Sequence, residues 1–206
     1  YGANGAPSGD EFQINTETNS TQFLSSVAAL ADGGFVVTWS STGQDTSSFG
    51  IYGQRYGSDG VATGGEFPIN TQTYTAQLYS SVAALADGGF VVTWSSSSQD
   101  GSNYGIYGQR FGADGAATGD EFRVNTETNS NQIYSSVAAL ADGGFVVTWS
   151  SDGQDSNGYG IYGQRYGADG TPSGGEFQVN TFTSIGQNYS SVAALADGGF
   201  VVTWSS

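Results

Sequence analysis

Short apolar runs recur along the chain between glycine-rich turns, and none has the spacing of an amphipathic helix. The clearest pattern is the stretch SSVAALADGGFVVTWSS, which occurs four times without change. The copies lie at residues 25–41, 80–96, 135–151 and 190–206. Their tryptophans are 55 residues apart, and a fixed period of this kind indicates a tandem-repeat protein. We therefore interpret residues 1–206 as a single repeat domain. Its units are approximately 1–41, which is partial, 42–96, 97–151 and 152–206.

The invariant stretch predicts a β-hairpin. Residues 25–31 form a first strand whose small side chains indicate close neighbours. Residues 35–40 form a second strand with β-branched and aromatic residues on both faces, which indicates burial on both sides. Asp32 and Gly33 between them are a strong hairpin signal, because glycine accepts the positive φ of a tight turn. We expect Asp32 and its copies to form turns. The copies are Asp87, Asp142 and Asp197.

Two further strands complete each unit. The third, in which β-forming residues alternate with polar residues or glycine, is expected at residues 50–56, 105–111 and 160–166. A variable loop precedes it at residues 42–48, 97–103 and 152–158. An Asp-Gly or Asn-Gly turn follows it. The fourth strand is short and is expected at residues 11–16, with equivalents that begin at Glu66, Glu121 and Glu176.

Four antiparallel strands per unit, without a helical signal, predict an all-β fold. The period favours a β-propeller of four repeats, in which small first strands crowd around the central axis. A β-solenoid and stacked β-sandwich repeats are the alternatives. The sequence holds only three complete third strands, so a blade built from residues 190–206 and 11–16 would be incomplete. Such a blade is irregular, takes a segment of a longer parent chain, or belongs to a larger ring shared between molecules.

The composition of the chain restricts the partners and binding sites that it can have. Four basic residues against nineteen acidic ones give a net charge of −15, which argues against nucleic acid as a partner and favours cations where carboxylates converge. No cysteine is present, so disulfides and thiolate metal sites are excluded. No apolar run has transmembrane length, and we expect no membrane insertion. The chain opens in mid-repeat at Tyr1, so we expect it to be a piece of a longer, exported bacterial protein.

Two motifs carry a resemblance to a known kind of repeat. These are ALADGGFVVTW at residues 29–39 and GIYGQRY at residues 50–56, with a Gln-Asp pair between them. Together they resemble the repeats of very large secreted proteobacterial and cyanobacterial proteins, often found beside calcium-binding nonapeptide repeats of the RTX type. The resemblance covers the whole chain and implies a secreted or cell-surface, adhesin-like protein. The nonapeptide motif itself is absent here, so calcium binding does not transfer with it.

Catalysis is not expected from the residue types available. Without histidine, cysteine or lysine, the chain lacks the usual general base and the thiol and amine nucleophiles. Paired carboxylates would suit a glycosidase, but active sites usually break symmetry, whereas these units share their acidic residues almost unchanged. The sequence therefore predicts a protein that is not an enzyme.

Glycan binding is the preferred function, because each full unit supplies an aromatic face for a sugar ring and planar polar groups for its hydroxyls. The candidate residues of the three units, with the fourth tryptophan, are Trp39, Tyr52, Gln54, Arg55, Asp45, Trp94, Tyr107, Gln109, Arg110, Asp100, Trp149, Tyr162, Gln164, Arg165, Asp155 and Trp204. The competing interpretation is structural. In it, Trp39 fills the space between blades, and Arg55 pairs with Glu66 or Asp45 or caps strand carbonyls.

Calcium is the one candidate cofactor. Asp152, Asp155 and Asn157 lie in a polar, glycine-flanked loop that could supply oxygen ligands, although such a loop also forms turns. The sequence as a whole predicts a non-enzymatic adhesion module that binds glycans through several weak sites with high avidity. The alternative is a structural spacer or self-assembling surface module, stabilised by calcium or not.

Overall fold

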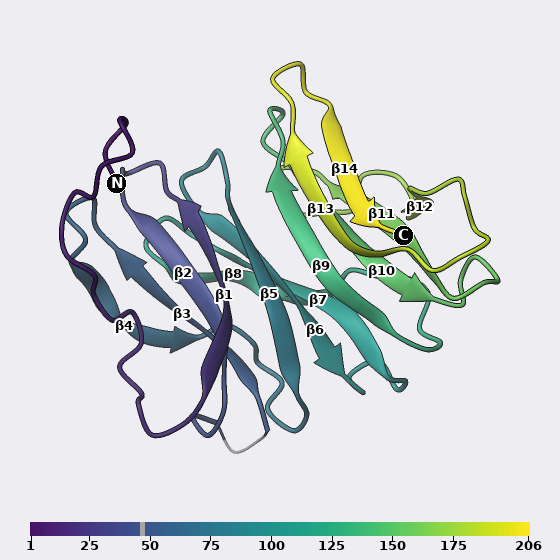
Figure 1. Ribbon diagram of the computed structural model, residues 1–206, viewed down its shortest axis with the longest axis horizontal. Helices are drawn as coiled ribbons and strands as arrows, with labels where there is room; N and C mark the ends of the chain where they lie inside the picture. Colours follow the sequence, from purple (N-terminus) through teal and green to yellow (C-terminus); the bar gives the residue numbers. More distant parts are fainter. Residues whose placement is uncertain (46–47) are drawn as a thin grey trace.

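The computed structural model describes residues 1–45 and 48–206, and every regular element within them is a β-strand. Figure 1 shows the sheets arranged as a fan that runs from the N-terminal to the C-terminal end. The prediction of an all-β propeller fold is confirmed, since the described residues form successive antiparallel sheets. The four-stranded sheets, at residues 22–68, 77–123 and 132–178, each cross a predicted unit boundary, because the invariant hairpin pairs with the third strand that follows it. Residues 46 and 47 of the predicted variable loop lie outside the described residues.

The described residues form three four-stranded sheets and one two-stranded sheet, each with its strands in chain order. The first sheet contains β1 (Gln22–Ala29), β2 (Phe35–Ser41), β3 (Gly50–Tyr56) and β4 (Ala62–Pro68). The second contains β5 (Gln77–Ala84), β6 (Phe90–Ser97), β7 (Tyr104–Phe111) and β8 (Ala117–Arg123). The third contains β9 (Gln132–Ala139), β10 (Phe145–Asp152), β11 (Tyr159–Tyr166) and β12 (Phe177–Gln178). The last is the hairpin of β13 (Asn188–Ala194) and β14 (Phe200–Ser205).

The first strands are innermost, as their small side chains predict. β1, β5, β9 and β13 lie next to one another along the inner side of the fan. Serine side chains join them: Ser26 Oγ accepts a hydrogen bond from Val82 N at 3.3 Å, and Ser81 Oγ accepts one from Val137 N at 3.2 Å. Larger side chains would keep these strands apart, so the Ser-Val-Ala composition follows from the close approach.

The core lies between the sheets. We call the face of a sheet that carries its tryptophan the front face, and the opposite face, which carries Val36 or its copies, the back face. The front face of each sheet packs on the back face of the sheet before it. Between the first two sheets, Phe90, Val92 and Trp94 pack with Val36 and Ile51. Trp94 is fully buried, which confirms that tryptophan fills the space between blades.

The predicted fourth strand at residues 11–16 is wrong. This segment has no strand structure and lies over the front face of the first sheet, where Tyr56 Oη donates to Ile14 O at 2.9 Å. Ile14 packs beside Trp39, as Ile69 packs beside Trp94 one unit later. Within the described residues, no strand pairs with the backbone of this segment.

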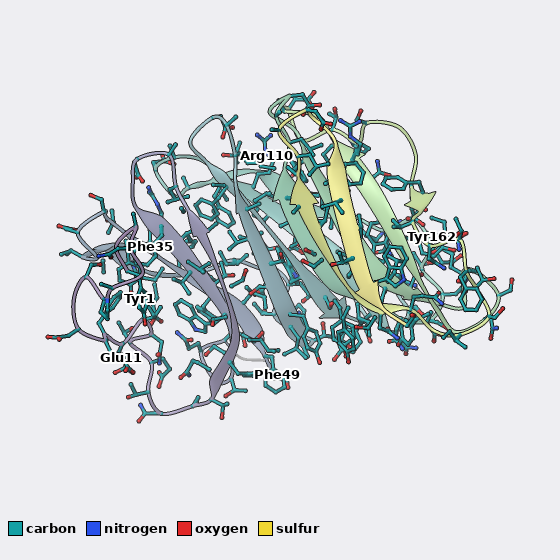
Figure 2. The ribbon with its side chains drawn as sticks, turned by 45° about the horizontal axis from the view of Figure 1, so that its top comes forward. Tyr1, Glu11, Phe35, Phe49, Arg110 and Tyr162 are labelled. Carbon is teal, nitrogen blue, oxygen red and sulfur yellow. The ribbon has the colours of Figure 1, made fainter. Side chains whose placement is uncertain are left out.

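The segment also does not join residues 190–206 in a closing blade. β13 and β14 pair only with each other, and the two termini lie at opposite ends of the fan (Figure 1). Figure 2 shows Tyr1 and Glu11 at the end of the first sheet, far from the C-terminal hairpin. No helix within the described residues has the length and hydropathy needed to cross a membrane.

Candidate functional site

Each innermost strand contains a β-bulge at the same position. In β5, Leu78 pairs with Ser95 and Ser81 pairs with Thr93, so Tyr79 and Ser80 both lie opposite Trp94. The first bulge residue has a left-handed backbone, with φ of 61° at Tyr79, 60° at Tyr134, 56° at Tyr189 and 57° at Leu24. A bulky residue in this region costs roughly 1–3 kcal/mol and persists only where its surroundings enforce it.

In the third and fourth sheets, two hydrogen bonds from the preceding sheet support the bulge. Ser95 Oγ in β6 accepts from Tyr134 N at 3.3 Å, and Thr93 Oγ1 donates to Ser135 Oγ at 3.0 Å. The same pair recurs one unit later, where Ser150 Oγ accepts from Tyr189 N at 3.2 Å and Thr148 Oγ1 donates to Ser190 Oγ at 3.0 Å. The backbone at Tyr134 and Tyr189 is therefore held by the preceding sheet, whereas β1 adopts the same bulge at Leu24 without one.

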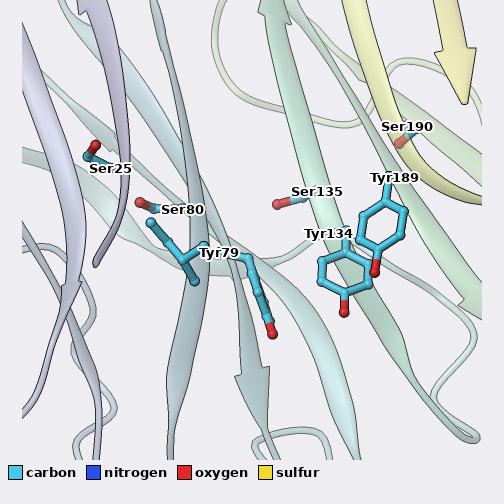
Figure 3. A pocket seen from close by; sticks show the side chains of 8 residues that line it. Ser25, Tyr79, Ser80, Tyr134, Ser135, Tyr189 and Ser190 are labelled. Atoms are coloured by element: carbon cyan, nitrogen blue, oxygen red, sulfur yellow. The ribbon is translucent and has the colours of Figure 1, made fainter. Parts of the chain in front are cut away.

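The bulges converge on one end of the inner strands and line an open pocket of about 260 Å³. Figure 3 shows the tyrosines that project into it from successive sheets. The pocket, which we call the axial pocket, is lined by Leu24, Ser25, Tyr79, Ser80, Tyr134, Ser135, Tyr189 and Ser190. The ring of Tyr134 lies between the other two tyrosines, with centroids 4.7 Å from Tyr79 and 4.5 Å from Tyr189. The three rings form a continuous aromatic row.

The phenol of Tyr134, at the centre of this row, is neutral near physiological pH. Burial raises the pKa of Tyr134, and hydrogen bonds and charge interactions with Tyr189 and Tyr79 raise it further. Burial also raises the pKa of Tyr159, and electrostatic interactions with Asp152 and Tyr189 raise it further. Neutral hydroxyls both donate and accept hydrogen bonds. The axial pocket thus offers aromatic faces and hydroxyl groups, the chemistry that suits an uncharged polyol.

The aromatic residues predicted as ligand-binding lie elsewhere. Trp39, Trp94 and Trp149 are buried between sheets, and Tyr52, Tyr107 and Tyr162 are buried as well. Only Trp204, in the two-stranded last sheet, has a substantial exposed fraction, 40%. None of these seven side chains lines the axial pocket.

The predicted polar residues are held by the fold. The side-chain amides of Gln54, Gln109 and Gln164 are buried and donate to the backbone carbonyl of the following arginine, in the first unit at 2.8 Å. Arg55 pairs with a carboxylate, as the structural interpretation expects, but the partner is neither Glu66 nor Asp45: its Nη2 atom lies 3.2 Å from Oδ2 of Asp32. The register places Arg55 opposite Val36, beside the turn that holds Asp32, and this explains the pairing. Arg110 and Arg165 pair in the same way with Asp87 and Asp142.

The aspartates of the Gln-Asp pairs lie against the third strand. A Cβ atom on Gly105 would be 2.6 Å from Oδ2 of Asp100, so the aspartate lies directly over the glycine near the start of β7. Equivalent contacts place Asp45 against Gly50 and Asp155 against Gly160. In the loop proposed for calcium, Oδ1 of Asp155 accepts from Asn157 N at 3.2 Å. Over residues 1–45 and 48–206, no three carboxylate, histidine or cysteine side chains are grouped to hold a metal, and calcium binding at Asp152, Asp155 and Asn157 stays a prediction.

Comparison with known proteins supports the fold. No protein-family model matches the chain, and no curated protein does either. Among solved structures, a protein of unknown function from Dyadobacter fermentans has a TM-score of 0.70 at 12% identity, over 93% of this chain and 64% of that one. The chain thus spans less than two thirds of that protein. An endo-arabinase from Bacteroides thetaiotaomicron has a TM-score of 0.59 at 15% identity, over 95% of this chain and 74% of the enzyme.

The Hadza microbial sialidase Hz136 matches as well, with a TM-score of 0.60 at 9% identity, over 83% of this chain and 39% of the sialidase. These neighbours correct one prediction from the sequence. The chain was expected not to be an enzyme, yet solved structures of this fold include an arabinase and a sialidase. Absence of histidine, cysteine and lysine does not exclude catalysis on such a fold, because glycosidases work with carboxylates.

Proposed function

We propose that this chain recognises carbohydrate and that the sugar binds in the axial pocket. The single observation that carries the proposal is the row of Tyr79, Tyr134 and Tyr189, held on left-handed backbone at one end of the inner strands. The rings contact one another from successive sheets but line a pocket and lie outside the apolar core between the sheets. Strain that is maintained by surrounding hydrogen bonds is characteristic of functional sites.

The chemistry of the pocket favours a neutral sugar. The C–H face of a sugar ring packs on an aromatic face, and neutral phenols bond its hydroxyls in either direction. The net charge of −15 disfavours anionic sugars through repulsion. Among the structural neighbours, the endo-arabinase acts on a neutral polysaccharide and the sialidase on an anionic sugar. A neutral chain of the arabinan type is therefore the preferred ligand.

The pocket changes how multivalent binding would arise. All four units contribute residues to one axial pocket, so each chain binds one glycan segment there. Avidity then comes from many copies on one surface, which is the arrangement expected of a secreted or cell-surface adhesin.

The test is a glycan-array screen followed by calorimetric titration with linear arabino-oligosaccharides, with sialyl oligosaccharides as the anionic comparison. Each titration is run in calcium and again in chelator. Tyr134→Ala is the test variant. Tyr74→Ala, which removes a tyrosine that is 88% exposed and does not line the pocket, is the matched control. The same incubations are analysed for released reducing sugar, so that binding and hydrolysis are measured together.

We expect the parent chain and Tyr74→Ala to bind neutral oligosaccharide equally, and Tyr134→Ala to bind about fivefold more weakly, since stacking on one aromatic ring is worth on the order of 1 kcal/mol. Unchanged binding by folded Tyr134→Ala would remove the axial pocket from the function. A blank array with folded protein would overturn carbohydrate recognition itself.

A further inference from the structure

The two ends of the fan expose residues that are buried at every internal interface. On the front face, Val82, Val137 and Val192 are 7–8% exposed because a sheet lies in front of them, whereas the equivalent Val27 of the first sheet is 64% exposed. The exposed fraction of this valine therefore shows whether another sheet covers the front face.

The back face of the last sheet shows the complementary difference. Val201 is 46% exposed, whereas its equivalents Val36, Val91 and Val146 are 0% exposed. Leu195 is 45% exposed, whereas Leu30, Leu85 and Leu140 are 4–6% exposed. The last sheet of the chain thus presents the surface that the back face of every other sheet buries.

The arginines of the third strands show the same difference in exposure between the internal sheets and the end of the fan. A Cβ atom on Gly115 would lie 3.1 Å from Arg55 Cδ, and one on Gly170 would lie 3.0 Å from Arg110 Cδ, so each arginine reaches the outer turn of the next sheet. The side chains of Arg55 and Arg110 are accordingly 10% and 13% exposed. Arg165 is 41% exposed, because the last sheet has no equivalent outer turn. That turn corresponds to Asn4 and Gly5 at the N-terminal end.

The N-terminal segment is already placed for such a contact. Ile14 packs on Val37, Trp39 and Tyr56, as Ile69 of the preceding unit packs on Val92, Trp94 and Phe111. The segment therefore occupies the position that a preceding repeat occupies at an internal interface. Beside it, a cavity of about 340 Å³ remains over Val37 and Trp39. At the internal interface, Val36 and Ile51 of the preceding sheet fill the equivalent space.

We propose that these two ends bind each other in different copies of the chain: the back face of β13 and β14 docks on the front face of β1 and β2 of a second copy. The occupant is a second copy because residues 25–41 and 190–206 are identical in sequence, and the contact between two such hairpins is already made three times within the chain. The third-strand part of the internal interfaces, such as Ile51, has no counterpart in the two-stranded last sheet. Such an interface is heterologous and joins copies head to tail. This proposal is independent of the axial pocket.

Charge sets the conditions of association. Each copy carries a net charge of −15, so copies repel one another at low ionic strength. Salt screens that repulsion, since the Debye length falls from about 10 Å at 0.1 M to about 3 Å at 1 M. The apolar contact itself is not weakened by salt. We therefore expect association to strengthen as sodium chloride is added.

The test is sedimentation velocity of the 206-residue chain over a concentration series, in low and high salt. Val27→Asp places a charge on the front face of the first sheet, and Val201→Asp places one on the back face of the last sheet. Both side chains are exposed in one copy, so neither change threatens folding. Val61→Asp is the matched control, since Val61 is 62% exposed and lies in the outer turn between β3 and β4. Circular dichroism verifies the fold of each variant.

We expect the parent chain and Val61→Asp to form species heavier than one 21.2 kDa chain, with weight-average mass rising with concentration and salt. Each end variant alone stays at the mass of one chain. A mixture of the two end variants forms a dimer that grows no further, because each copy retains one functional end. A parent chain that stays at one chain mass, or end variants that associate like the parent, would overturn the proposal.

Discussion

Trp94 and the bulge pair Tyr79 and Ser80 lie opposite each other on neighbouring strands, yet their surroundings differ completely. Trp94 points between two sheets and is fully buried, whereas Tyr79 points into the axial pocket. The tryptophan is invariant in all four units, but the bulge tyrosine is replaced by Leu24 in the first. Invariance here marks a packing position. The candidate binding surface arises where the backbone departs from a regular strand.

The largest effect that distinguishes the two regions is expected at the tryptophans. Trp94→Ala opens a cavity between the first two sheets and should cost about 3–5 kcal/mol. For a chain of this size, that lowers the melting temperature by on the order of 10 °C. Trp204→Ala removes the same side chain from the last sheet, where it is 40% exposed, and should cost about 1 kcal/mol. Thermal unfolding followed by circular dichroism measures both.

Comparing Trp94→Ala with Trp204→Ala isolates the effect of burial, because the residue and its local sequence are the same in both units. If Trp94→Ala does not fold, Trp94→Phe keeps part of the contact and should still destabilise more than Trp204→Phe. Equal losses at the two positions would mean that burial between sheets does not hold the fan together.

The sequence was sufficient to predict the all-β fold, the hairpin turns, the innermost first strands and the burial of tryptophan between sheets. Each of these depends on local propensity and on a repeat that makes four units consistent. The strand at residues 11–16 was mispredicted because strand pairing is not local: the segment has the right residues but no third strand to pair with.

The axial pocket could not be predicted for a related reason. The contacts that surround a bulge, such as the hydrogen bond from Thr93 to Ser135, join residues that are 42 positions apart and are not visible in the pattern of one strand. The one available signal was a tyrosine directly before the invariant stretch in three units, at Tyr79, Tyr134 and Tyr189. Aromatic, glutamine and arginine residues inside the stretch or in the third strand gave a stronger pattern, but their role is structural.

A smaller loss of stability, at a tyrosine buried beside Trp94, is expected at alkaline pH. Tyr107 pairs with Trp94 across the sheet, and burial, followed by the charge of Asp100, raises its pKa to about 12. Because the folded pKa lies above the ordinary value of 10.0, the neutral phenol stabilises the fold fully below pH 10. That stability is lost as pH rises from about 10 through 12.

Melting temperatures measured from pH 8 to about 12 should therefore fall steeply above pH 10 for the parent chain. Tyr107→Phe has no proton to lose at this site and should fall less steeply. Parallel curves for the two proteins would show that the Tyr107 phenol does not contribute to the alkaline loss.

The smallest effect is expected at the pocket itself. Tyr134→Gly relieves a φ of 60°, which is unfavourable for tyrosine, but loses ring contacts with Tyr79 and Tyr189. These contributions oppose each other, so stability should change by no more than about 1 kcal/mol, or roughly 2–4 °C. Tyr134→Val also loses the ring but keeps a β-branched side chain on left-handed backbone, and it should melt below Tyr134→Gly. If Tyr134→Gly destabilises as much as Trp94→Ala, Tyr134 is a core residue and the distinction between the two regions fails. If it melts near the parent and no longer binds neutral oligosaccharide, the tyrosine row is maintained for its ligand and not for the fold.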